Sequence, residues 1–181
     1  MGGTTAKYGF PYPSGTDRLM DGDNAIQALA EKVEATLGNG VSLGHSVGQA
    51  IPKNVATALV FDFEYYDTAG YHTGSSSRIT IPTGQAGRYL VGYTAVYIPY
   101  ATGTNRQAWI QRNGATSDRA ATALGFASAS YSAPMAGTAT FDLVAGNYLE
   151  LMSSQDSDIA LNVQGNNTAA HLLEFYAVRI G

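Results

Sequence analysis

The chain has 181 residues, few charged side chains (13%), 21 glycines and 12 tyrosines, a composition typical of one compact β-rich domain with a short appendage. It contains no cysteine, which excludes disulfides, thiolate metal sites and cysteine nucleophiles. The net charge is -4 without a cluster of Lys and Arg, which argues against a nucleic-acid partner because phosphates are bound largely by basic side chains.

The first residues, MGGTTAKYGFPYP, lack the basic start and the continuous apolar stretch of a signal peptide. No run approaches the ~20 apolar residues that a membrane span needs. We therefore expect no membrane partner. If the protein acts outside a cell, we expect it to leave by a route other than secretion.

The first twenty residues predict an extended arm. Glycine and proline recur throughout this segment, which disfavours a regular element. The arm also carries aromatic side chains that can insert into another surface, so we predict that it anchors the chain through Tyr8, Phe10 and Tyr12. The alternative is a poorly ordered terminus whose aromatic residues pack on their own domain.

Residues 24–37 are predicted to form an amphipathic helix that Asp21 or Asp23 caps and Gly38 ends. A helix of about four turns is marginally stable alone in water. Its apolar face must therefore be covered by the chain's own β-domain, by symmetry-related copies of the chain, or by a foreign surface. We predict that this face also anchors the chain, through Ile26, Leu29, Val33 and Leu37.

Glycines recur just after the helix, so residues 41–49 are predicted to be a linker between an anchoring segment, residues 1–40, and a β-domain, residues 50–181. The stretch DGDN at 21–24 invites a calcium-binding interpretation, because alternating Asp residues with a Gly can wrap a hard cation. The further ligands and the closing Glu of such a loop are not at the required spacing, so capping is favoured and no metal is predicted.

From about residue 49 the pattern changes to a period of two residues, which is typical of β-strands. The stretch ATALVFDFEYYD, residues 56–67, predicts one half-buried strand. Its apolar side chains alternate with polar ones and are expected to point the same way: Leu59, Phe61, Phe63 and Tyr65.

The stretch GRYLVGYTAVYIP, residues 87–99, predicts a strand that is apolar on both faces. Leu90, Val96 and Ile98 lie on one face and a row of tyrosines lies on the other. A strand buried on both sides suggests one face for the core and one for a protein interface. We predict that the tyrosine row closes a trimer, through Tyr89, Tyr93 and Tyr97; the alternative is that the tyrosines face solvent.

Turn residues divide the rest of the chain into hairpins, at Asn113-Gly114 and at residues 145–147. The last segment, AAHLLEFYAVRIG, is again apolar on both faces. Strands at this spacing, with turns between them and no second helix, predict a mainly β fold. The expected architecture is a β-sandwich or jelly roll preceded by an extended arm and one short α-helix.

Over roughly residues 50–181 the order of segments resembles the C1q and tumour-necrosis-factor family of trimeric jelly rolls. The cues are an aromatic first strand, the stretch ITIPTGQAGRYLVGYTAVY, a QRNG hairpin, the ATFDLVAGNYLELM pair and a closing FYAVRI strand. The resemblance implies a C1q/TNF-like jelly-roll β-sandwich that forms a homotrimer and is not an enzyme. The secreted members carry a signal peptide and a collagen stalk, which this chain lacks, so an extracellular signalling role is not implied.

The front segment, PYPSGTDRLMDGDNAIQALAEKVEATLG, is similar to the start of tailed-bacteriophage virion proteins. In those proteins a Pro-Tyr-Pro arm and a helix precede a fibre or head domain. Together the two resemblances imply a homotrimeric minor capsid or head-fibre protein that decorates or stabilises the capsid and binds the major capsid protein. The alternative is a minor tail or fibre protein, with a tail protein as partner, whose jelly roll binds a host receptor or glycan. Both place the protein in the virion.

No catalytic constellation is visible in the sequence. The histidines stand in unrelated settings, and no serine lies in a G-x-S-x-G elbow. Alternation places most carboxylates on solvent faces, so a glycan-cleaving enzyme is the least favoured interpretation and no cofactor is predicted. Exposed loops are polar by default, yet three are candidate surfaces for a glycan: HTGSSSR at 72–78, ATGTNR at 101–106 and SSQDSD at 153–158.

Overall fold

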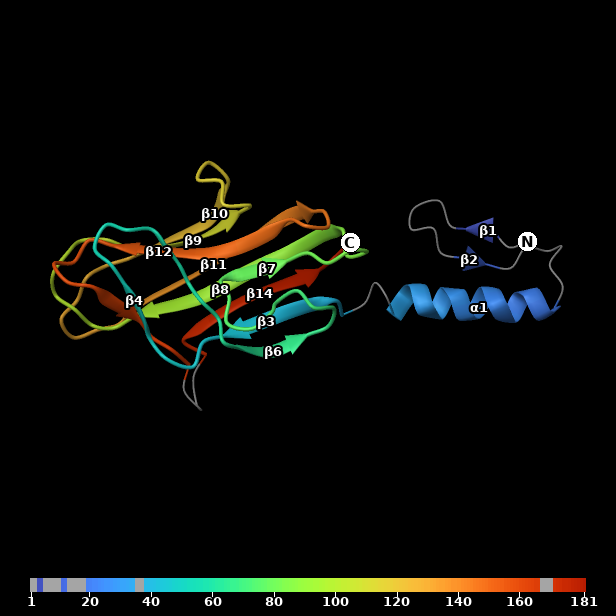
Figure 1. Ribbon diagram of the computed structural model, residues 1–181, viewed down its shortest axis with the longest axis horizontal. Coiled ribbons are helices and arrows are strands. Elements are labelled where there is room, and N and C mark those ends of the chain that lie inside the picture. Colours follow the sequence, from blue (N-terminus) through green and yellow to red (C-terminus); the bar gives the residue numbers. More distant parts are fainter. Residues whose placement is uncertain (1–2, 5–10, 13–18, 35–37, 167–170) are drawn as a thin grey trace. The chain divides into compact units, whose positions relative to one another are not determined.

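The computed structural model describes residues 3–4, 11–12, 19–34, 38–166 and 171–181. The chain divides into two units, residues 1–39 and Gly40–Gly181 (Figure 1). In the part of the chain that the structure describes, no helix is long and apolar enough to cross a membrane.

The first unit contains a short antiparallel ribbon and one helix. Strand β1 (Gly3–Thr4) pairs with strand β2 (Pro11–Tyr12), and helix α1 (Leu19–Glu34) lies next to β2. The ribbon was not expected, because a segment rich in glycine and proline favours turns over regular elements. The two β-bridged residues in each strand are nevertheless enough to bring the start of the arm back beside Tyr12.

Helix α1 begins at Leu19, several residues before the predicted start. Asp21 and Asp23 therefore lie inside the helix and do not cap it, so the predicted capping is wrong. Leucine and methionine have high helix propensities, which favours the earlier start. The stretch DGDN is helical and does not form a calcium loop. Gly38 has a φ of 75°, the left-handed conformation that commonly follows a helix end.

The second unit is built from two antiparallel sheets packed face to face, a β-sandwich (Figure 1). The five-stranded sheet contains β5 (Thr57–Ala58), β7 (Arg78–Thr80), β9 (Arg106–Arg112), β10 (Arg119–Gly125) and β12 (Tyr148–Gln155). The seven-stranded sheet contains β3 (Gly40–Gly44), β4 (Gln49–Ile51), β6 (Phe63–Asp67), β8 (Gly87–Tyr97), β11 (Ala133–Leu143), β13 (Leu161–Val163) and β14 (Leu173–Arg179). The mainly β jelly-roll prediction is confirmed.

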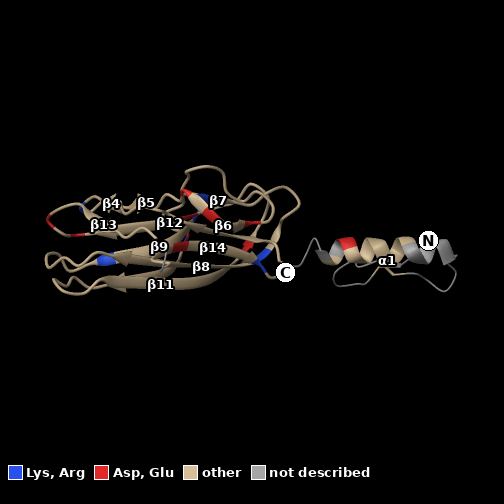
Figure 2. Cartoon of the chain, turned by 90° about the horizontal axis from the view of Figure 1, so that it is seen from below, with Lys and Arg blue, Asp and Glu red and all other residues tan. Residues whose placement is uncertain are grey.

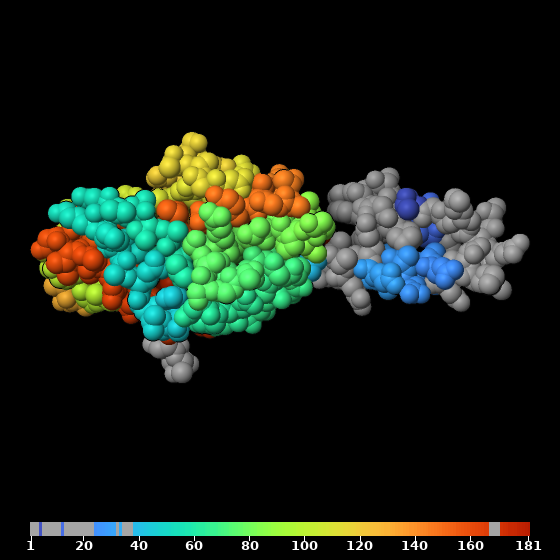
Figure 3. Space-filling view, in the orientation of Figure 1, coloured from blue at the N-terminus to red at the C-terminus, as the bar shows by residue number. Residues whose placement is uncertain are grey.

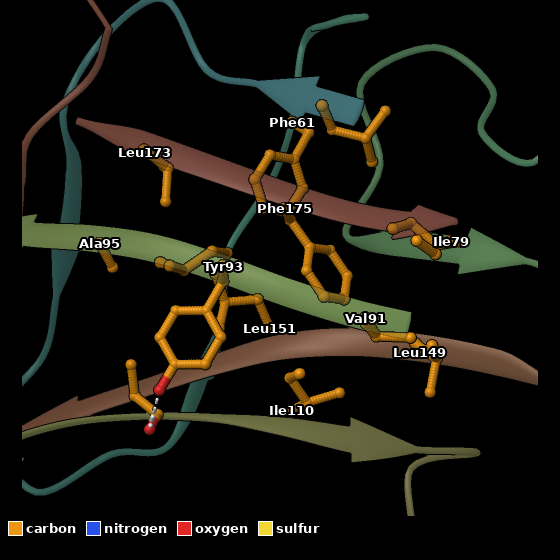
Figure 4. Close-up of a cluster of buried hydrophobic side chains, with 14 of the residues drawn as sticks. Phe61, Ile79, Val91, Tyr93, Ala95, Ile110, Leu149, Leu151, Leu173 and Phe175 are labelled. Carbon is orange, nitrogen blue, oxygen red and sulfur yellow. Dashed lines mark hydrogen bonds between the residues drawn. The ribbon is translucent and has the colours of Figure 1, made fainter. Parts of the chain in front are cut away.

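Strand β8 is the centre of the seven-stranded sheet. It pairs with β11 on one side and with β14 on the other, β14 pairs with β3, and β3 pairs with β6. Alternate side chains of β8 and β14 are buried between the sheets, and Figure 4 shows several of them. The rings of Phe61 and Phe175 stack there, with centroids 5.6 Å apart. Around them pack Ile79, Val91, Ala95, Ile110, Leu149, Leu151 and Leu173.

The predicted linker at residues 41–49 is wrong, because this segment begins inside the sheet. Strand β3 lies between β14 and β6, and Val41 and Leu43 are fully buried in the core. The glycines of this strand allow close packing. A Cβ at Gly40 would stand 2.6 Å from the Ala177 carbonyl oxygen, and one at Gly44 would collide with the Phe63 ring. The β-unit therefore starts at Gly40, ten residues before the predicted boundary.

The segment 56–67, predicted to be one strand, contains two strands in different sheets. Strand β5 pairs with β12 in the five-stranded sheet, and β6 pairs with β3 in the seven-stranded sheet. Leu59 and Phe61 are buried in the core as expected, but Phe63 and Tyr65 are not. When the chain crosses from one sheet to the other, its side chains no longer alternate regularly between core and solvent. A bulge in the β3–β6 ladder shifts the alternation a second time.

Candidate functional site

The tyrosine row of β8 lies inside the β-sandwich, so the prediction that it closes a trimer is wrong. Tyr93 is 2% exposed, and Tyr89 and Tyr97 are fully buried within a single chain. The predicted alternation along β8 is confirmed, but the two faces have exchanged roles. Leu90 and Ile98 of the other face are exposed, and Val96 is half-buried.

The tyrosines fit the core because each hydroxyl has a polar partner there. The Tyr93 hydroxyl lies 2.8 Å from the Ala108 carbonyl oxygen and 2.7 Å from that of Ala121 (Figure 4). The hydroxyls of Tyr97 and Ser153 lie 2.7 Å apart. Burial raises the pKa of both Tyr93 and Tyr97 to about 12, since it disfavours the phenolate. Both therefore stay neutral at physiological pH.

The candidate functional site is the face of the seven-stranded sheet that is turned away from the core, which we call the outward face. Figure 2 shows β8 and β11 almost wholly without charged residues along their length. Leu90 on the central strand β8 is 38% exposed, a large fraction for a leucine with strands paired on both sides. The apolar side chains of this face are Tyr66, Leu90, Val96, Ile98, Tyr176, Val178 and Ile180.

The strand register arranges these side chains in rows across the sheet. Leu90 lies beside Thr140 of β11 and Val178 of β14. In the next row Tyr176 stands beside Gly92, where a Cβ would collide with the Tyr176 hydroxyl. The tyrosine therefore lies across the strand instead of standing away from it. The result is a low apolar surface that another sheet can cover.

The charged groups of the outward face already have partners. The Ser42 hydroxyl donates to the Glu174 carboxylate at 2.6 Å, and His171 Nδ1 lies 3.5 Å from the same carboxylate. The His171 ring stacks on Tyr65 with centroids 4.4 Å apart. Burial, and next the charge of Glu174, raise the pKa of Tyr66. If this face is covered, the Glu174 carboxylate keeps Ser42 as a hydrogen-bond donor, which lowers the cost of burying it.

The residues predicted to anchor the chain are only partly within the described residues. Tyr12 in β2 is exposed, and Ile26 in α1 is 61% exposed. Leu29 and Val33 are half-buried on the same helix. Tyr8, Phe10 and Leu37 lie outside the described residues. The structure leaves the anchoring role of this group a prediction.

Two of the three polar loops meet. The Thr104 hydroxyl donates to the Asp156 carboxylate at 2.8 Å, and so does the Asn105 backbone N–H. Beneath them the buried Arg106 guanidinium donates to the Thr102 carbonyl oxygen at 2.9 Å. The third loop lies elsewhere, since His72 Nδ1 is 3.1 Å from a Glu64 oxygen in β6. Loops 101–106 and 153–158 therefore form one ordered structure.

This loop pair is expected to weaken in acid. The Asn105 N–H and the Thr104 hydroxyl and N–H hold the pKa of Asp156 below its usual range. A lowered folded-state pKa contributes stability that is present above the unfolded pKa of about 3.9 and is lost as the pH falls through the folded value. The neutral variant Asp156→Asn should melt a few degrees lower than the natural protein at neutral pH. This gap should shrink below about pH 4, and a gap that is constant over this range would contradict the assignment.

Searches with the sequence find no matching family model and no matching curated protein. Solved structures do match. The globular domain of zebrafish complement 1qA protein is 12% identical with a TM-score of 0.56, over 79% of this chain and 98% of that one. Murine APRIL at pH 5.0 is 9% identical with a TM-score of 0.57, over 78% and 98%. Eiger TNF from S. frugiperda is 11% identical with a TM-score of 0.54, over 79% and 92%.

At these identities the similarity shows the fold alone. The β-unit is a C1q/TNF-like jelly roll, as the order of sequence segments predicted. Sequence reasoning missed the outward face as the candidate site, although its residues were identified as the second apolar face of β8. The sequence did contain an indication that the tyrosine face could be the core. A buried tyrosine hydroxyl can donate to a backbone carbonyl oxygen, so a tyrosine row does not have to lie at a protein surface.

Proposed function

We propose that the protein is a non-enzymatic virion structural component that assembles as a homotrimer through the outward face of the seven-stranded sheet. The observation that carries the proposal is the apolar part of this face in which the exposed Leu90 lies beside the half-buried Val178. An apolar surface with few charges is typical of the buried part of a permanent interface.

The family that the chain resembles supports the threefold arrangement. Its members assemble as trimers. The outward face belongs to the sheet that contains the first and last strands of the β-unit, β3 and β14. The Glu174 carboxylate already accepts a hydrogen bond from the Ser42 hydroxyl and lies 3.5 Å from His171 Nδ1. Desolvation on assembly would therefore cost less than for an unpaired carboxylate.

The N-terminal unit is the proposed attachment device. Its similarity to the start of tailed-bacteriophage virion proteins supports a capsid decoration or head-fibre role, with the major capsid protein as partner. Tyr12 and Ile26 offer exposed apolar side chains for this contact. The second candidate is a tail or fibre protein with a receptor-binding jelly roll, which the two joined polar loops favour.

A variant that begins at Gly40 separates assembly from attachment. The β-unit retains its core and its outward face, so we expect this variant to have the native mass of a trimer in light scattering. It should fail to bind particles that lack the protein, whereas the full chain should bind them. A monomeric Gly40 variant would contradict assembly through the outward face, and binding at the level of the full chain would remove the N-terminal unit from the attachment role.

The number of copies in each particle distinguishes the two candidates. A decoration protein occupies many equivalent shell positions, whereas a tail protein is present in few copies. Quantitative gel analysis of purified particles measures this ratio against the major capsid protein.

A further inference from the structure

A cleft of about 300 Å³ opens on the five-stranded sheet, on the side turned away from the core. Gln107 and Trp109 of β9 line it, and they alternate along the strand with Ala108 and Ile110, which face the core. Figure 3 shows the teal segment between β4 and β5, which supplies Asn54, on the same face as the yellow β10 segment. The cleft is therefore separate from the outward face.

The floor of the cleft contains an aromatic ring covered by a cation. The Arg119 guanidinium lies 4.5 Å from the centre of the Trp109 ring, which is only 2% exposed. The indole N–H donates to Gln111 Oε1 at 3.3 Å, which fixes the ring. A guanidinium held flat on a ring keeps its N–H edges free for an anion beside it.

A second arginine on the same sheet, Arg78, also lies over an aromatic ring and serves as a comparison for Arg119. Arg78 lies 3.9 Å from the centre of the Tyr148 ring, and its Nε donates to the Glu150 carboxylate at 3.2 Å. Arg119 has no carboxylate within ion-pair distance among the described residues. The neighbouring Asp156 is already engaged by Thr104, Asn105 and Arg106. The Arg119 guanidinium is thus stacked in the same way but has no acidic partner among the residues that the structure describes.

The cleft also contains neutral polar side chains with unused hydrogen-bonding capacity. Within the described part of the chain, no hydrogen bond is formed by the side chains of Asn54, Asn105, Gln107 and Ser154, all of which line the cleft. Amides both donate and accept, so they match the paired hydroxyls of a sugar ring. A nucleic-acid strand or a phosphate-rich ligand would require more cations than Arg119, the one Lys or Arg among the described residues that line the cleft.

We propose that this cleft binds an acidic saccharide. The sugar carboxylate binds the edge of the Arg119 guanidinium, and the ring hydroxyls bind Gln107, Asn105 and Asn54. The inference rests on the second candidate function, a ligand-binding jelly roll, because residues of the two joined polar loops line the cleft. It does not depend on the trimer, because the cleft lies on the other sheet.

The chain contains a single tryptophan, so its fluorescence reports this cleft directly. The full chain is titrated with a short oligogalacturonate, with sialyllactose, and with a neutral oligosaccharide of similar length. We expect a saturable change in Trp109 emission with at least one of the two acidic probes. The acidic arms distinguish a uronate from a sialic acid. Binding of neither acidic probe, or equally tight binding of the neutral one, would overturn the proposal.

Variants locate the contact. Arg119→Ala should weaken binding of the responding probe by about tenfold or more, because it removes a charge-assisted hydrogen bond. Arg119→Lys keeps the charge but loses the planar fork, so it should bind with intermediate affinity. Gln107→Ala leaves the stacked pair intact and should also weaken binding. The matched control Arg78→Ala removes the other stacked arginine and should bind as the natural protein does.

Affinities of the variants are measured by calorimetry, because Arg119→Ala itself changes the surroundings of the fluorophore. Unchanged affinity in Arg119→Ala, with binding lost in Arg78→Ala, would place the contact outside the cleft. Native mass, measured in parallel, keeps this result separate from the trimer proposal: a trimer that binds no acidic saccharide contradicts only the cleft.

Discussion

Replacing Tyr93 with aspartate is expected to abolish folding of the β-sandwich. The side chain is 2% exposed, packs between the two sheets and bonds to backbone carbonyls of the opposite sheet. Aspartate would lose this packing and place a carboxylate beside carbonyl oxygens, where an unpaired ion costs several kcal/mol. A domain of this size has only about 5–15 kcal/mol of stability. Circular dichroism and proteolysis of the purified variant should show an unfolded or aggregated β-unit.

Two further variants test whether burial of the charge causes the loss of folding. Tyr93→Phe keeps the ring but leaves the Ala108 and Ala121 carbonyl oxygens without this donor. It should fold with a loss of about 1–3 kcal/mol. Tyr131→Asp places the same charge at an exposed position and should leave stability nearly unchanged. A folded monomeric Tyr93→Asp protein would instead support a tyrosine row at the trimer interface.

Replacing Leu90 with aspartate is expected to convert the trimer to folded monomers. Leu90 lies on the outward face, beside Thr140 and Val178, so the sandwich core does not need it. In the proposed trimer the substitution places a carboxylate in each of the covered apolar patches. Each carboxylate without a partner costs several kcal/mol, enough to raise the dissociation constant by orders of magnitude. Light scattering should give the mass of one chain, 19.0 kDa, with an unchanged circular dichroism spectrum.

Leu124→Asp is the matched control. Leu124 is an exposed leucine on β10, in the five-stranded sheet, and the same substitution there should leave the trimer intact. Dissociation by Leu124→Asp together with a stable Leu90→Asp trimer would move the interface to the five-stranded sheet. A monomeric natural protein would contradict the assembly proposal as a whole.

Local patterns in the sequence determined much of the fold. The two-residue period predicted strands from about residue 49, and Asn113 and Gly114 predicted a tight turn, where both residues have positive φ values of 51° and 68°. The alternation of β8 was also predicted correctly, residue by residue. These features depend on backbone geometry within a few neighbouring residues, so the sequence alone contains them.

The glycines of β3 show where local patterns fail. Glycine is common both in flexible linkers and where two backbones approach closely. The choice depends on Ala177 and Phe63, which are distant in sequence and adjacent only in the folded sheet. The crossing of segment 56–67 between sheets has the same origin, because pairing with β12 and β3 overrides a continuous alternation.

The sequence by itself determined that β8 has two apolar faces, and only the tertiary structure decided which of them is the core. Either face is hydrophobic enough to be buried, so composition does not distinguish them. The decision depends on whether tyrosine hydroxyls find acceptors, and those of Tyr93 and Tyr97 find them on strands β9, β10 and β12 of the opposite sheet. Those acceptors come within reach only when the two sheets pack, and the same packing leaves Leu90 exposed on the outward face.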